Sequence, residues 1–328
     1  MQRRPMILSL LGGAALPRAA GAQTAYPNRI ARIVVPFPPG GATDMVARYI
    51  ANKLSEVNRQ QFVIDNRPGA NGSIGIAFVA RPPADGYTIL ISSNGALIGN
   101  PRIYGDAGFT TDQLQLVIRL VGYKYVLIVN PRQNLSHVRD LMALARSKPG
   151  GLNYGSGGIG NSSHLIGALF SRSIGIPMTH VPFRGGALSM NALVAGDIDL
   201  IFSTTPEALP QIGNGLVKPL GILGTTRIEQ LPDVPALAET GLDVPELASW
   251  MCLAVPRGTP AAIVEQINAQ VNEILNLEET RAAFMPLGLQ QLGGSVEDVN
   301  RRLAQEVPLW EEVIAASGAS AEGGPVRR

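Results

Sequence analysis

The sequence predicts an α/β fold. Short apolar runs of strand length alternate with helical patterns from Ile30 onward, and 45% of the 328 residues are hydrophobic, which is enough for a buried core. Glycine-rich loops also lead directly from strand patterns into helix patterns at three places. This alternation favours a largely parallel sheet, with ligands bound at the carboxyl ends of its strands.

The first strand, loop and helix define an arrangement that recurs. A β-branched run at residues 33–35 leads through the loop segment 36–44 into a helix with apolar residues at spacings of three and four from Ala47 onward. Free N–H groups and the helix dipole can bind an anion at such a helix start, and Thr43 or Asp44 is the expected N-cap. Alternatively, the glycines only turn the chain, since the loop lacks the Gly-Lys-Ser/Thr and Gly-x-Gly-x-x-Gly patterns of phosphate sites.

Two later loops repeat the first. Residues 155–162 lead into a helix whose natural cap is Asn161 or Ser162, and residues 183–187 lead from a strand into another helix. Ser203 follows the next predicted strand, so it also lies at a carboxyl end. Three such loops are what a cleft between two lobes would use to hold an acidic small molecule with neutral N–H groups. The predicted strands after the first are 62–64, 88–92, 125–129, 179–182, 198–202, 217–223 and 249–255.

The carboxyl-terminal part predicts two long helices. We expect Thr259 to cap the first, with Pro260 at its first position. Pro308 should kink the second, which runs to about Ala316. The last residues, 319–328, are expected to form a disordered tail.

The amino terminus has the order of a secretory signal. Arg3 and Arg4 precede a short apolar segment, and Ala20-Gly21-Ala22 fits a cleavage site, so we expect removal of residues 1–22. Removal of that segment leaves 24 basic and 25 acidic residues, and no basic run stands out, so a nucleic-acid partner is not expected. No later stretch has the length and apolarity of a membrane span, so we expect no stable membrane insertion.

These segments together resemble a known family, the Bug-type extracytoplasmic solute receptors of the tripartite tricarboxylate transporter family. The most telling is Pro-Phe-Pro-Pro-Gly-Gly-Ala-Thr-Asp at 36–44. The others, in the family's order, are 66–72, 85–88, 154–156, 163–165, 181–185, 231–235, 249–250 and 256–260. The resemblance extends from about Tyr26 to Gly318.

The resemblance implies a type II periplasmic-binding-protein fold, in which two α/β lobes are joined by two crossing strands and the ligand lies in the cleft between them. With crossings near 123–129 and 250–255, lobe one is expected at 24–124 plus 250–318, and lobe two at 125–249. Closure of the cleft would be a hinge motion of the lobes around the ligand.

The resemblance also implies a function. The protein is expected to be a periplasmic receptor that captures a small carboxylate and delivers it to membrane subunits of a tripartite tricarboxylate-type transporter. We expect a monomer with no cofactor and no metal. Many relatives have aspartate where Ser203 stands, and the neutral side chain should favour an anion over an amine. The predicted ligand-binding residues are Phe37, Pro38, Gly40, Gly41, Ala42, Thr43, Asp44, Ser93, Ser156, Gly157, Ser162, His164, Arg184, Gly185 and Ser203.

Two other classes of function stay open. A receptor that presents its ligand to a membrane sensor would have the same sequence features. An enzyme acting on a small carboxylate is the other alternative, although Ser156 fails the Gly-x-Ser-x-Gly pattern because Tyr154 occupies its first glycine position. The histidines and the single cysteine match no known metal spacing, and His164 fits a packed helix residue as well as a base. Arg184 fits a ligand contact or a surface position equally.

Overall fold

The fold is described from a computed structural model, which covers residues 26–81, 83–242 and 244–319. The expected signal peptide at residues 1–22 and its cleavage site lie outside these residues. The expected tail also lies outside them, apart from Ala319.

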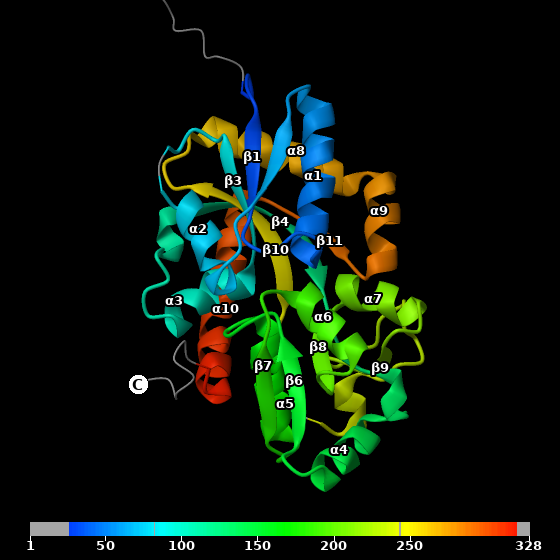
Figure 1. The fold of residues 1–328 in the computed structure, drawn as a ribbon. Coiled ribbons are helices and arrows are strands. Elements are labelled where there is room, and N and C mark those ends of the chain that lie inside the picture. The colour runs from blue at the N-terminus through cyan, green and yellow to red at the C-terminus, as the bar shows by residue number, and fades with distance from the viewer. Residues whose placement is uncertain (1–25, 82, 243, 320–328) are drawn as a thin grey trace, which may run out of the picture.

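Within the described residues, two β-sheets form the centres of two α/β lobes, as the sequence predicts (Figure 1). The strands and helices of lobe one are β1 Ala31–Val35, α1 Ala42–Asn58, β2 Phe62–Asn66, α2 Ser73–Val79, β3 Thr88–Ser93, α3 Asn94–Ile103, β4 Leu114–Tyr123, β10 Ser249–Pro256, α8 Ala261–Asn276, α9 Glu278–Phe284, β11 Gln290–Gly293 and α10 Val296–Ser317. Those of lobe two are β5 Tyr125–Val129, α4 Val138–Ser147, β6 Leu152–Ser156, α5 Ser162–Ser173, β7 Met178–Pro182, α6 Gly186–Ala195, β8 Leu200–Thr204, α7 Thr205–Gly213 and β9 Lys218–Ile222.

Both sheets are mixed, whereas the sequence favoured a largely parallel sheet. The strand order is β11-β4-β10-β3-β1-β2 in lobe one and β7-β6-β8-β5-β9 in lobe two. In lobe one, β1 pairs in parallel with β2 and β3, while β10 runs antiparallel to β3 and β4. In lobe two, β5 runs antiparallel to β8 and β9. The antiparallel strands β5 and β10 are those next to the connections between lobes, so they enter their sheets from the other lobe.

The two lobes are connected in three ways. Only Lys124 separates β4 in lobe one from β5 in lobe two, and β10 returns the chain to lobe one. The third connection is α10, which lies along one side of both lobes and contacts α3 and α5 (Figure 1). Trp310 of α10 is buried in an apolar core that includes Val34 of lobe one and Leu127 of lobe two. The predicted domain limits of 24–124 with 250–318, and 125–249, stay a prediction.

Three predictions about helix ends need correction or comment. The N-cap of α1 is Gly41, and not Thr43 or Asp44. The N-cap of α8 is Pro260, and the Thr259 hydroxyl donates to the carbonyl of Pro256 at 2.7 Å. Pro308, expected to kink the last helix, lies inside a single helix, α10.

Candidate functional site

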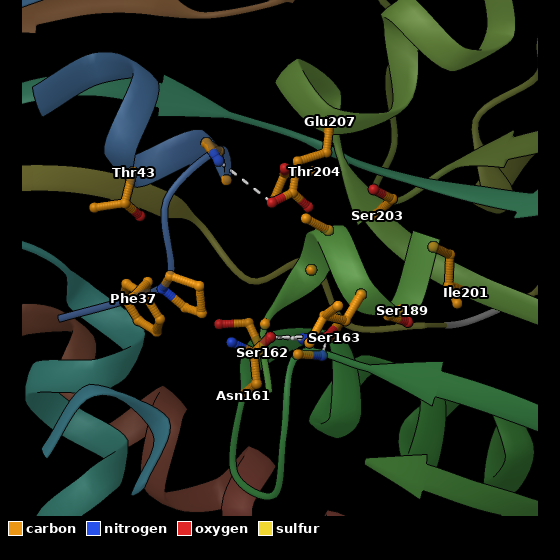
Figure 2. A pocket seen from close by; sticks show the side chains of 18 of the residues that line it. Phe37, Thr43, Asn161, Ser162, Ser163, Ser189, Ile201, Ser203, Thr204 and Glu207 are labelled. Atoms are coloured by element: carbon orange, nitrogen blue, oxygen red, sulfur yellow. Dashed lines mark hydrogen bonds between the residues drawn. The ribbon is translucent and has the colours of Figure 1, made fainter. Parts of the chain in front are cut away.

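A cavity of about 230 Å³ lies between the lobes, where the carboxyl ends of β1, β3, β6, β7 and β8 meet (Figure 2). This volume is below the roughly 300–1,000 Å³ of pockets for drug-sized ligands, so it suits a small metabolite. Its lining residues are Phe37, Pro38, Pro39, Gly41, Ala42, Thr43, Ser93, Tyr123, Tyr125, Gly155, Gly157, Asn161, Ser162, Ser163, Arg184, Gly185, Gly186, Ala187, Leu188, Ser189, Ile201, Phe202, Ser203, Thr204, Glu207 and Met251.

The starts of α1, α5 and α6 surround this cavity. The N-cap of α1, Gly41, has no side chain to accept from the first N–H groups of the helix, so these groups need other acceptors. Asn161 caps α5, as predicted, and accepts a hydrogen bond from Ser163 N–H at 3.0 Å. Gly185 caps α6 with a φ of 121°, a conformation that favours glycine. Three positive helix ends therefore face one small space.

The lobes touch each other around the cavity. A Cβ atom at Gly185 of lobe two would lie 3.3 Å from Pro38 of lobe one, so the two glycine-rich loops are in close contact. Asn161 Nδ2 donates to Asn71 Oδ1 at 3.2 Å, and the Tyr104 hydroxyl donates to the carbonyl of Ile159 at 2.7 Å. Residues of both lobes therefore bound the cavity.

Glu207 brings a carboxylate into the cavity. It lies in the first turn of α7 in lobe two and accepts a hydrogen bond from Ala42 N–H of α1 at 3.3 Å (Figure 2). A Cβ atom at Gly186 would lie 2.3 Å from Glu207 Oε2, so the carboxylate also packs against the start of α6. Burial raises the pKa of Glu207 above its usual range, and the hydrogen bond from Ala42 with the nearby Thr204 and Ser203 hydroxyls offsets this only in part.

Two charged side chains line the cavity, Glu207 and Arg184. Arg184 is exposed and forms no ion pair with another residue in the described part of the chain. One hydroxyl group in the wall, that of Ser189, is buried without a hydrogen-bond partner among the described residues. Buried polar groups are nearly always paired, so this hydroxyl is suited to meet a polar ligand.

The structure brings eleven of the fifteen residues predicted from the sequence to the cavity wall. They are Phe37, Pro38, Gly41, Ala42, Thr43, Ser93, Gly157, Ser162, Arg184, Gly185 and Ser203. The remaining predicted residues lie beside the cavity and do not line it; these are Gly40, Asp44, Ser156 and His164.

Asp44 and Gly40 are hydrogen-bonded to each other. The buried Asp44 carboxylate accepts hydrogen bonds from Gly40 N–H at 3.0 Å, Arg48 Nε at 2.8 Å and Asn66 Nδ2 at 2.9 Å. Burial alone would raise the pKa of Asp44, but these hydrogen bonds outweigh burial and hold that pKa below its usual range. Asp44 therefore fixes the loop before α1 and faces away from the cavity.

Ser156 and His164 belong to a packed cluster behind the wall. The rings of His164 and His180 stack with their centroids 3.8 Å apart, and Tyr154 stacks on His180 at 5.0 Å. The Ser156 hydroxyl lies 2.6 Å from His180 Nε2, and His164 Nδ1 accepts from Gly160 N–H. Burial lowers the pKa of His164 to about 4 and that of His180 to about 3, with the neighbouring His164 as a second cause for His180. Both rings are therefore neutral near pH 7.

Sequence reasoning missed Glu207, Ser189, Tyr123 and Tyr125 as members of the site. Glu207 could have been identified, because it lies in the first turn after a strand that ends at the ligand edge, behind Thr205-Pro206. Ser189 and the two tyrosines carry no such local signal. Their place in the wall depends on how the lobes meet.

Two kinds of site are not found in the described ranges. No group of three or more His, Cys, Asp or Glu side chains there is arranged to hold a metal ion. None of the helices described combines the length and the apolarity that a membrane crossing needs.

A two-lobed α/β fold with a small cavity between the lobes is the arrangement found in solute-binding proteins. A match to a family model agrees with this class and identifies one family within it. Residues 46–319 match the model described as the tripartite tricarboxylate transporter family receptor. The chain belongs to this family.

Similar proteins agree with this assignment. The chain is 36% identical over 296 residues to a UPF0065 protein of Pseudomonas sp. strain P51, which covers 88% of this chain and 87% of that protein. It is 30% identical over 296 residues to BugT of Bordetella pertussis, with 90% and 91% of the two chains covered. The solved structure of Rpa4515 of R. palustris with adipate aligns with a TM-score of 0.85 at 35% identity, over 90% of this chain and 99% of that one.

Proposed function

We propose that this protein is a periplasmic receptor that captures a small carboxylate-containing ligand between its lobes. In this proposal it delivers the ligand to membrane subunits of a tripartite tricarboxylate-type transporter. Family membership supports the receptor role, and the predicted export signal supports the location. The observation that carries the ligand class is the convergence of three helix starts on one cavity beside Arg184, an exposed cation without a described ion-pair partner.

The geometry favours recognition through backbone groups. The N–H groups of Thr43 and Ser162 lie in the first turns of α1 and α5, at the cavity wall. A ligand carboxylate would accept charge-assisted hydrogen bonds from such groups without a metal, and each is worth about 1.5–3 kcal/mol. The Ser189 hydroxyl would add a further polar contact. A related protein with adipate in its structure supports a short aliphatic acid as the kind of ligand.

The test is a calorimetric titration of protein purified without refolding. The probes are succinate, glutarate and adipate, their monoamides, and their neutral diamides. We expect at least one probe with a carboxylate to bind, and the matched diamide to bind roughly ten- to a hundredfold more weakly, because the charge-assisted hydrogen bonds are lost. Diamides that bind as tightly as the acids would contradict the proposal.

Two variants separate backbone recognition from recognition by a cation. Arg184→Ala should weaken binding of the best acid less than the change from carboxylate to amide does. Arg139→Ala, which removes an exposed arginine of α4 away from the cavity, is the matched control and should leave affinity unchanged. If Arg184→Ala abolishes binding, the cation and not the helix starts dominates recognition.

A further inference from the structure

Glu207 lies in the cavity wall beside two of the helix starts. Its carboxylate accepts from Ala42 N–H at the start of α1, and it lies against Gly186 at the start of α6. Two of the three helix starts around the cavity therefore already face a negative charge supplied by the protein. The start of α5 is left without one, and Ser162 and Ser163 of that helix line the cavity (Figure 2).

The charge balance of the wall has a consequence for the ligand. Glu207 and Arg184 are the charged side chains among the lining residues, so their formal charges cancel. Asp44 lies behind the wall and is paired with Arg48. A ligand with one carboxylate adds one negative charge, which Arg184 and the α5 start can accommodate. A second carboxylate would be confined in the same small space as Glu207, and unpaired like charges held close together are strongly unfavourable.

Glu207 can also accept a hydrogen bond from a ligand. An ionised carboxylate accepts several hydrogen bonds, and Glu207 accepts one from Ala42 N–H and has the Ser203 and Thr204 hydroxyls close to it. The Ser189 hydroxyl, 2% exposed and unpartnered, lies in the same wall and marks the cavity as a polar site independently of the helix starts. A ligand group that faces Glu207 can therefore donate a hydrogen bond to this carboxylate, whereas a second carboxylate cannot.

We propose that Glu207 determines the ligand class: it selects a small monocarboxylate with a hydrogen-bond donor at its other end, such as an amide or hydroxyl, over the dicarboxylate of the same length. The carboxylate of the ligand faces the start of α5 and Arg184, and the donor faces Glu207. This inference rests on the proposed function. It separates this chain from its relative with adipate, which is a dicarboxylate.

The test compares matched ligand pairs in matched variants. The pairs are succinate, glutarate and adipate, each with its own monoamide. The variants are Glu207→Gln, whose amide oxygen can still accept from Ala42 N–H, and Glu273→Gln, an exposed glutamate of α8 that serves as the control for loss of one charge. Affinities come from calorimetric titration, and urea unfolding checks that both variants fold.

Wild type and Glu273→Gln should bind the best monoamide about tenfold or more tightly than its diacid. Glu207→Gln should tighten binding of the diacid by a similar factor and weaken binding of the monoamide, so the preference reverses. The inference is overturned if the diacid binds better in wild type, or if Glu207→Gln tightens both members of a pair equally. The second result would mean that any ligand displaces the Glu207 side chain. If diamides bind as tightly as every acid, the proposed function fails as well, so the two failures differ.

Discussion

Removal of the Asp44 side chain should loosen the loop that forms one wall of the cavity. Asp44 lies in the first turn of α1, and its carboxylate joins three partners: Gly40 in the loop, Arg48 one turn later, and Asn66 at the end of β2. Asp44→Ala would leave the loop amide and the Asn66 side chain without this acceptor. We therefore expect a loss of stability together with weaker ligand binding.

The contacts give an order of magnitude for that loss. The Arg48 side chain is 52% exposed, so its ion pair with Asp44 is screened by solvent and contributes under about 1 kcal/mol. The hydrogen bonds from Gly40 and Asn66 are made to a charged group, for which about 1.5–3 kcal/mol each is typical. Asn66 keeps a hydrogen bond to the carbonyl of Phe37, which reduces the cost. The expected loss is about 2–4 kcal/mol in the free energy of unfolding.

Urea unfolding followed by circular dichroism measures this loss. Glu311→Ala is the matched control, because it removes a carboxylate that is 53% exposed and paired with Arg102 on the surface. The control should lose less than about 1 kcal/mol. If Asp44→Ala is no more destabilised than the control, Asp44 does not hold the loop, and its hydrogen bonds contribute less to the free energy of unfolding than expected.

The pH dependence provides a second check on Asp44. Its pKa is lower in the folded protein than the ordinary value that it regains on unfolding. The stabilisation is therefore complete above about pH 4 and is lost as the pH falls through the folded pKa. The gap in stability between wild type and Asp44→Ala should shrink in that acid range. A constant gap would show that the loss comes from packing and not from charge.

Two further predictions concern the wall and the cluster behind it. Gly41→Val should abolish ligand binding with little change in stability: its φ of −82° suits any residue, but a Cβ atom there already lies 3.3 Å from Glu207 Oε1, so the added methyl groups fill the cavity. Titration with the best acid and a urea midpoint measure the two effects, and retained affinity would contradict the prediction. In the folded protein the pKa values of His164 and His180 are about 4 and about 3, whereas both return to about 6.5 on unfolding. Below about pH 6.5 the unfolded chain therefore binds more protons than the folded protein, and the stability should fall as the pH drops. His180→Gln should flatten that slope in unfolding experiments, and an unchanged slope would remove the pair as its cause.

Local sequence signals predicted the parts of the site that lie within one strand, loop and helix. The glycine-rich run at 36–41 lies at the cavity because it follows a strand end, and the Asn161 cap follows from the same pattern. The antiparallel entry of β5 and β10 was not predicted, because the direction of a strand depends on which lobe the chain comes from. Periodicity contains no such information.

Contacts between distant residues explain why some of the predicted residues do not line the cavity. Asp44 was expected at the ligand, but Arg48 and Asn66 turn its carboxylate into the loop, and Asn66 comes from another strand. The ring of His164 stacks on that of His180, which lies in β7. Glu207 meets Ala42 across 165 positions of sequence, so this contact requires the closed arrangement of both lobes. The neutral Ser203 suggested a less negative cleft, and the carboxylate of Glu207 in the same wall adds a negative charge there.

Native mass spectrometry of protein purified from the periplasm without refolding tests the central claim most directly. The account predicts that a single small molecule bearing a carboxylate copurifies with wild type, is released on denaturation, and is missing from Gly41→Val. A copurified molecule without a carboxylate, or one that is equally abundant in Gly41→Val, would contradict the claim that the cavity between the lobes is a carboxylate site.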